Sequence, residues 1–102
     1  DVADMLRSMT GMLRDKNPDM NKDALLPIVL GYYAQARPET DIDTFFEQSV
    51  SATRVMALGL AMRYLTDTVD GTYFQWDPSR FPDSASHNRF RAQRQLNNFS
   101  AL

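Results

Sequence analysis

The sequence predicts an all-α protein of four to five helices, with one long buried helix and an aromatic-rich loop. Three observations lead to this fold class. Apolar residues recur at helical spacing along most of the 102 residues, alternation of β-branched residues is almost absent, and glycines are few and isolated. A chain of this length supports one hydrophobic core, so we expect a single helical domain or subdomain over residues 1–102.

Two helices are predicted in the N-terminal third. The first spans roughly residues 2–15, with Asp1 as its N-cap, and ends at Asn17-Pro18-Asp19. The second runs from about residue 23 to residue 36. Pro27 falls in its first turn, where the missing N–H group does little harm.

The longest helix is predicted from about Gln48 to Val69, after a short helical stretch that follows Thr40. Twelve of the twenty residues from Val50 to Val69 are apolar and cover most of the circumference, which is typical of a helix buried on several sides. Its polar residues form a narrow stripe: Gly59, Arg63, Thr66, Asp67 and Asp70. Gly71 follows, where helices commonly end in a left-handed glycine.

An irregular loop over residues 72–85 separates the long helix from the last one. Its aromatic residues are Tyr73, Phe74, Trp76 and Phe81. We expect this loop to lie as a lid over the helical core; a wall of a ligand site is the alternative, because aromatic rings also stack on sugars and bases. The last helix begins near Ser86 or Asn88. Its inner stripe is predicted to be Ala92, Leu96 and Phe99.

Composition excludes several classes of chemistry. The chain has no cysteine, which removes disulfides and thiolate sites, and its one histidine, His87, cannot make a multi-histidine metal site. No glycine-rich phosphate loop and no nucleophile–base motif is present. No signal peptide and no apolar run of about eighteen residues is visible. We therefore expect a soluble, cytoplasmic chain without a catalytic residue or metal site of its own.

Charge is distributed unevenly along the chain. Residues 1–79 carry 7 basic and 12 acidic side chains, whereas residues 80–102 carry four arginines against one aspartate. Such a basic tail either docks on the acidic body or binds an anionic partner. We favour docking, because three net positive charges are few, and we expect no nucleic-acid partner and no membrane partner.

Two ion pairs are predicted within single helices. Asp4 and Arg7 stand three positions apart in the first helix, and Arg63 and Asp67 stand four apart in the long one. Because an unpaired guanidinium in apolar surroundings is costly, Arg63 needs a partner. Asp67 is the local candidate, and the alternative is that Arg63 lines a pocket for a polar ligand.

Three stretches carry a family resemblance, and their order and spacing agree over nearly the whole chain. Asp1-Val2-Ala3-Asp4-Met5-Leu6-Arg7-Ser8 is similar to a D-F-G-D-x-x-R-S string. Arg63-Tyr64-Leu65-Thr66-Asp67, with Asp70-Gly71 and Tyr73-Phe74, is similar to R-F-L-T-D-x-x-x-G-D-x-Y-F. His87-Asn88, Arg91 and Gln95 are similar to an H-N-x-x-R-A-R-x-Q helix. These strings occur in aminoglycoside-phosphotransferase-like kinases, and the chain most resembles the N-acetylhexosamine 1-kinase branch.

The resemblance implies the helical C-terminal part of a larger kinase that transfers phosphate from ATP to an N-acetylhexosamine. ATP and magnesium would then bind in the parent protein, and the N-terminal portion of that protein is the expected partner. A chain that opens on Asp1 rather than methionine fits such a fragment. We expect the acceptor sugar to be bound by four residues: Arg63, Tyr73, Arg7 and His87. Ala3, Thr72 and residues 78–84 depart from the family's pattern, which leaves the sugar's identity open.

Other classes of function remain open. A free-standing helical interaction module would dock a peptide or helix in an apolar groove. A nucleic-acid adaptor would use the arginine tail and bind with strong salt dependence. A subdomain that is built to lie against a larger lobe also leaves an apolar face to cover, so a homodimer of the fragment is a further candidate assembly.

Overall fold

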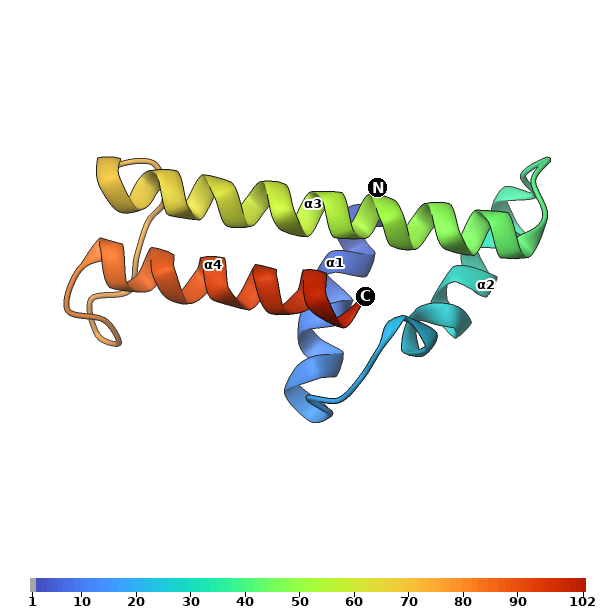
Figure 1. Ribbon diagram of the computed structural model, residues 1–102, viewed down its shortest axis with the longest axis horizontal. Helices are drawn as coiled ribbons and strands as arrows, with labels where there is room; N and C mark the ends of the chain where they lie inside the picture. The colour runs from blue at the N-terminus through green and yellow to red at the C-terminus, as the bar shows by residue number, and fades with distance from the viewer. Residues whose placement is uncertain (1) are drawn as a thin grey trace.

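The computed structural model describes residues 2–102, whose regular elements are all helices and which contain no strand, so the all-α prediction is confirmed. The elements are α1 (Val2–Lys16), the 3-10 helix η1 (Lys22–Leu25), α2 (Leu26–Ala36), α3 (Ile42–Asp70) and α4 (Ser84–Ala101). Figure 1 shows α3 and α4 running side by side, with α1 crossing the pair and α2 leading into the N-terminal half of α3. The N-cap predicted at Asp1 lies outside the described residues.

Both N-terminal helices end close to the predicted positions. α1 ends at Lys16, just before Asn17-Pro18, because a proline disfavours helical backbone in the residue that precedes it. α2 has Pro27 in its first turn and closes at Arg37, whose left-handed backbone (φ 45°) ends the helix. The one difference is that residues 22–25 form a separate 3-10 turn before α2.

α3 is one continuous helix of 29 residues, whereas the sequence predicted a short stretch and then a longer helix. Asp41 starts it, because its carboxylate accepts the N–H of Thr44 at 2.8 Å and so satisfies a backbone donor of the first turn. The helix ends as predicted at Gly71, whose φ of 72° is a left-handed conformation that suits glycine.

α4 differs from its prediction in its start and in its inner face. It begins at Ser84, because the carboxylate of Asp83 accepts the N–H of Ser86 at 2.7 Å. Leu96 and Phe99 are only partly buried. Ala92 is buried as predicted, but its buried companions are polar: His87, Asn88, Gln95 and Asn98. The position of this helix is therefore specified by hydrogen bonds as well as by apolar contact.

The two ends of the molecule are held together differently. At one end, a hydrophobic core joins α1, η1, α2 and the N-terminal half of α3. Its buried residues are Leu6, Leu25, Val29, Phe46 and Val50. Along the α3–α4 pair, the buried apolar side chains are small: Ala57, Ala61 and Ala92. Small side chains let two helix backbones approach closely. The α3–α4 interface is therefore narrow and contains many polar side chains, whereas the core around α1 and α2 is wide and apolar.

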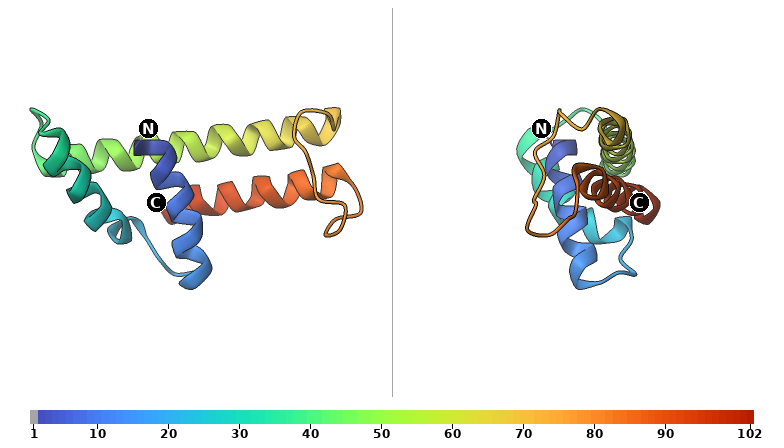
Figure 2. Two further views of the ribbon diagram at one scale, coloured as in Figure 1. Left: turned by 180° about the vertical axis from the view of Figure 1, so that it is seen from behind. Right: turned by 90° about the vertical axis from the view of Figure 1, so that its left-hand side faces the viewer.

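The prediction that the long helix is buried on several sides is wrong. Five of its apolar side chains are exposed: Val55 (70%), Leu58 (38%), Met62 (61%), Leu65 (47%) and Val69 (89%). The reason is that α4 and α1 cover only part of its circumference (Figure 2). The molecule is correspondingly elongated, at 47 × 25 × 20 Å, and its radius of gyration of 15.4 Å exceeds the ~13 Å of a compact domain of this length.

Candidate functional site

A pocket of about 390 Å³ lies where α3 ends and the aromatic loop begins. Its lining residues are Met62, Arg63, Thr66, Asp67, Asp70 and Tyr73. They bring a guanidinium, two carboxylates, a hydroxyl and an aromatic ring to one opening, and the volume is in the range of small-molecule sites. The pocket thus brings together two of the four residues that were predicted to bind the acceptor sugar, Arg63 and Tyr73.

Asp67 fixes the wall of this pocket. Its side chain is only 2% exposed, and its carboxylate accepts the backbone N–H groups of Thr72 (3.1 Å), Tyr73 (2.8 Å) and Phe74 (3.0 Å). The buried Asn88 of α4 donates a fourth hydrogen bond at 3.0 Å. The N–H groups of Phe74 and then Tyr73 contribute most to holding the pKa of the Asp67 carboxyl below its usual value, against the opposing effect of burial. Asp67 therefore ties the start of the loop to both long helices.

The ion pair predicted between Arg63 and Asp67 does not form in the described part of the chain. Asp67 uses its oxygens for the loop and Asn88, and no hydrogen bond or ion pair within residues 2–102 reaches the exposed side chain of Arg63. The physical reason is that loop N–H groups have no other partner when buried, whereas a guanidinium can turn to water. Arg63 therefore presents an unpaired cation to the pocket.

Tyr73 is positioned by its neighbours although its side chain is 77% exposed. Its N–H is bonded to Asp67, and its ring meets Phe74 edge-on at 4.8 Å. Phe74 in turn packs on Tyr64 of α3 at 4.5 Å. An exposed ring on such a support can stack on the apolar face of a ligand without first being ordered.

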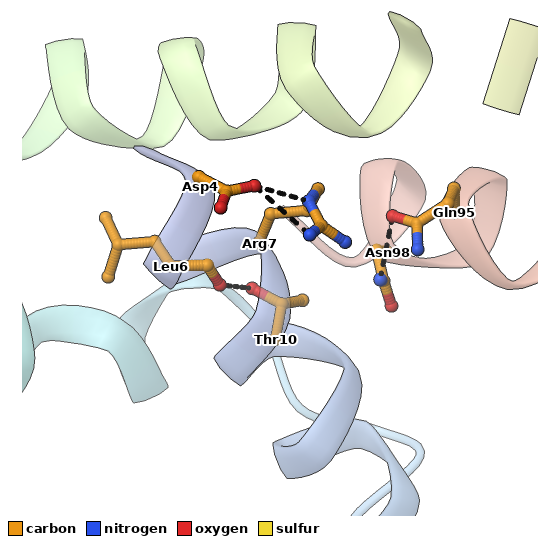
Figure 3. Close-up of polar contacts among 6 residues, drawn as sticks. All are labelled: Asp4, Leu6, Arg7, Thr10, Gln95 and Asn98. Atoms are coloured by element: carbon orange, nitrogen blue, oxygen red, sulfur yellow. Dashed lines mark hydrogen bonds and ion pairs between the residues drawn. The ribbon is translucent and has the colours of Figure 1, made fainter. Parts of the chain in front are cut away.

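Arg7 lies on α1, away from the pocket lining. Its Nε and Nη2 atoms donate to Oδ1 of Asp4 at 3.3 and 3.1 Å, so the ion pair predicted within this helix is present. Figure 3 shows the pair on the stretch of α1 that faces α4, where Asn98 donates to Gln95 at 3.4 Å. Only 20% of the Arg7 side chain is exposed. Arg7 is therefore paired within its own helix and does not line the pocket.

His87 lies beneath the aromatic loop and is also absent from the pocket lining. It is 8% exposed, its ring stacks on Phe81 at 4.1 Å, and its Nδ1 atom accepts the N–H of Asp77 at 3.1 Å. Burial, with Arg91 and Arg80 nearby, lowers the pKa of His87. An acceptor Nδ1 requires the neutral ring, so geometry and charge favour the same state.

Two arginines of the basic tail, Arg91 and Arg94, are bonded to elements outside the last helix, whereas Arg89 donates only to Ser86 within it. Arg94 donates to both carboxylate oxygens of Asp15 on α1, at 3.0 and 2.9 Å. Arg91 donates to the carbonyl of Gln75 at 2.6 Å and lies 5.5 Å from the ring of Tyr64. These contacts support the interpretation that the tail docks on the acidic body.

Sequence reasoning missed the loop-anchoring function of Asp67, the part of Asn88 in it, and the place of Asp70 in the pocket. A signal for the first was available, because a carboxylate one turn before a helix-ending glycine lies within reach of the N–H groups that follow Gly71. No local signal identifies Asn88, which lies 21 residues further along the chain.

The described residues contain no group of three or more His, Cys, Asp or Glu side chains that could hold a metal ion. None of the helices among them is long and apolar enough to cross a membrane. Comparisons with protein-family models, curated proteins and solved structures found no match.

Proposed function

We propose that this chain is the helical part of an ATP-dependent sugar phosphotransferase, and that the pocket at the end of α3 binds the acceptor sugar, an N-acetylhexosamine. The observation that carries the proposal is that Arg63 and Tyr73, both expected to bind the sugar, line one pocket. The chain is not catalytic alone, because ATP and magnesium belong to the rest of the parent protein. ATP as the phosphoryl donor implies a cytoplasmic location.

The pocket offers the groups that a hydroxyl-rich ring needs. The guanidinium of Arg63 has five N–H donors in a rigid fork, and the carboxylate of Asp70 can accept hydrogen bonds from sugar hydroxyls. The ring of Tyr73 offers an apolar face to the C–H groups of a sugar. Phosphoryl transfer depends mainly on positioning, so a site that holds the acceptor in one orientation contributes directly to rate.

The experiment that tests the proposal is a ¹⁵N–¹H NMR titration of the chain with N-acetylglucosamine and N-acetylgalactosamine. For a ligand of about 15 non-hydrogen atoms, a binding free energy of ~0.3 kcal/mol per atom corresponds to a Kd of roughly 0.5 mM. We expect shifts confined to the amides of α3 after Met62 and of the loop near Tyr73. Arg63→Ala and Tyr73→Ala should each abolish them.

Arg89→Ala is the matched control, because Arg89 is also an exposed arginine but lies on α4 outside the pocket lining. It should leave the titration unchanged. Saturating sugar that moves no pocket amide, or moves them equally in Arg63→Ala, refutes the sugar site.

A helical interaction module is a second candidate function, favoured by the exposed apolar side chains of α3. The two candidates differ in what the gene must encode before Asp1. The kinase proposal requires a β-rich ATP-binding lobe and an H-G-D-like catalytic loop there, and a gene without them refutes it.

A further inference from the structure

The exposed apolar side chains of α3 form one continuous stripe, which we call the α3 stripe: Val55, Leu58, Met62, Leu65 and Val69. Their separations of three and four residues alternate, which is the seven-residue repeat of helices that pack against another helix. At 1.5 Å per residue, the stripe is about 21 Å long. α1 and α4 cover only part of the circumference of α3 (Figure 2), and the exposure of the stripe residues places them on the uncovered part.

The chain also exposes more surface than a compact monomer of its mass. Its accessible surface is 6537 Å², whereas a monomer of 11.7 kDa exposes about 5,900 Å². The excess of roughly 600 Å² approaches the ~800 Å² that each partner buries in a standard interface. The surface thus contains enough unburied area for one modest helix–helix contact.

We propose that a second copy of this chain covers the α3 stripe, with the two α3 helices antiparallel about a two-fold axis near Met62. The stripe needs a helix with the same apolar repeat. Among the described helices only α3 exposes such a repeat. The large apolar side chains that the other helices expose are few: Leu26 and Leu30 on α2, Met12 on α1 and Phe90 on α4. A self-complementary patch forms an isologous contact. The two Met62 side chains then meet at the axis, and Val55 of each copy lies opposite Val69 of the other.

The residues beside the stripe fit this arrangement. Gly59 and Thr66 lie on one flank and are small, and a Cβ added at Gly59 would meet no atom within 4 Å, so that flank is open. The antiparallel alignment places Gly59 of one copy beside Thr66 of the other, which allows close approach. Arg63 and Asp70 lie farther around the helix at 100° per residue, so the contact brings no like charges together.

The dimer goes beyond the proposed function and can be tested separately from it. The contact shares two residues with the pocket lining, Met62 at the axis and Thr66 on the flank, whereas the other four stripe residues lie outside the lining. Loss of sugar binding in Arg63→Ala leaves the dimer unaffected. Disruption of the stripe at Val55 and Val69, neither of which lines the pocket, tests the dimer alone.

Sedimentation equilibrium over a concentration series measures the association of the chain. An interface at the small end of the range predicts a Kd on the order of 10–100 µM. Val55→Glu together with Val69→Glu places charges on side chains that are 70% and 89% exposed, so the monomer fold persists and the Kd rises at least ~30-fold. Leu30→Glu, at a side chain 45% exposed on α2, is the matched control and leaves the Kd unchanged.

Disulfide cross-linking tests the orientation, because the chain contains no native cysteine. Met62→Cys should cross-link to itself across the axis, and Val55→Cys should cross-link to Val69→Cys when the two variants are mixed. The proposal is overturned by a chain that stays monomeric at every concentration, by a dimer that survives the double glutamate substitution, or by Val69→Cys pairing with itself.

Discussion

Replacing Asn88 by alanine tests the junction that places Tyr73 in the pocket. Asn88 is fully buried, donates to Asp67 at 3.0 Å and accepts from Arg91 at 3.3 Å. Asn88→Ala removes the one side-chain donor of a buried carboxylate and leaves a small void between α3 and α4. The loop N–H groups remain, so the carboxylate keeps most of its partners.

The size of the effect follows from these two losses. A hydrogen bond to a charged group contributes about 1.5–3 kcal/mol, and a void of two to three atoms adds about 1 kcal/mol. We therefore expect Asn88→Ala to lower the free energy of unfolding by about 3 kcal/mol, which corresponds to a fall in Tm of roughly 10–20 °C for a domain of this size. Asn88→Asp places a second carboxylate at hydrogen-bond distance and should be worse at neutral pH, with partial recovery as the pH falls toward 4.

Thermal and urea unfolding followed by circular dichroism measure this loss. Asn97→Ala is the matched control, because Asn97 lies on the same helix and its side chain accepts only an exposed hydrogen bond from Gln93 at 2.9 Å. It should change the free energy of unfolding by less than ~1 kcal/mol. Equal effects of the two substitutions, or an Asn88→Asp variant that gains no stability in acid, would refute the reasoning.

Three further substitutions have defined outcomes. Gly71→Ala forces a β-carbon into a left-handed backbone (φ 72°) and to 3.2 Å from the hydroxyl of Ser84, so it should cost about 1–2 kcal/mol. Leu6→Ala empties a fully buried position of the core and should cost about 3–5 kcal/mol. Folding lowers the pKa of His87 from its usual value of 6.5. As the pH falls below 6.5, His87 is therefore protonated in the unfolded chain before it is protonated in the folded one. The contribution of His87 to the free energy of unfolding is complete above pH 6.5 and decreases below it. His87→Asn keeps an acceptor for the N–H of Asp77 and should flatten this slope.

Urea unfolding measures the first two free energies, and Tm as a function of pH measures the third. A Gly71→Ala variant as stable as the parent contradicts the strain argument. A Leu6→Ala variant within 1 kcal/mol of the parent contradicts the placement of the core, since that is the usual scale of surface substitutions. An unchanged pH slope in His87→Asn shows that another group titrates in this range.

Helix ends were predictable because their causes are local. Asn17-Pro18 and Gly71 stop α1 and α3 through their own backbone preferences, and those ends are found as predicted. α3 and α4 begin earlier than predicted, because Asp41 and Asp83 act as N-caps and neither residue was predicted to be a cap. With capping included, these boundaries also lie within reach of local reasoning.

Burial and partner choice were not predictable, because they depend on which element packs where. The 3.6-residue pattern of α3 indicates a wide apolar face but not that the side of Val55 and Val69 lacks a neighbour. The four-residue spacing predicts an ion pair between Arg63 and Asp67. In the structure, buried N–H groups of the loop occupy the Asp67 carboxylate instead, because they compete for it more strongly than Arg63 does. The pocket arises from this outcome, since Asp67 orders Tyr73 and leaves Arg63 without an ion-pair partner among residues 2–102.

The two ends of the molecule are stabilised by different interactions, so we expect the cooperativity of unfolding to depend on pH. The apolar core around Leu6 and Val29 contains no titrating group, whereas the loop end requires a charged Asp67 and a neutral His87. Acid protonates both side chains, so we expect the loop to unfold locally at a pH at which α1 and α2 are still protected from hydrogen exchange. We therefore expect the position of Tyr73 in the pocket to depend on pH, whereas the packing of the apolar core should not.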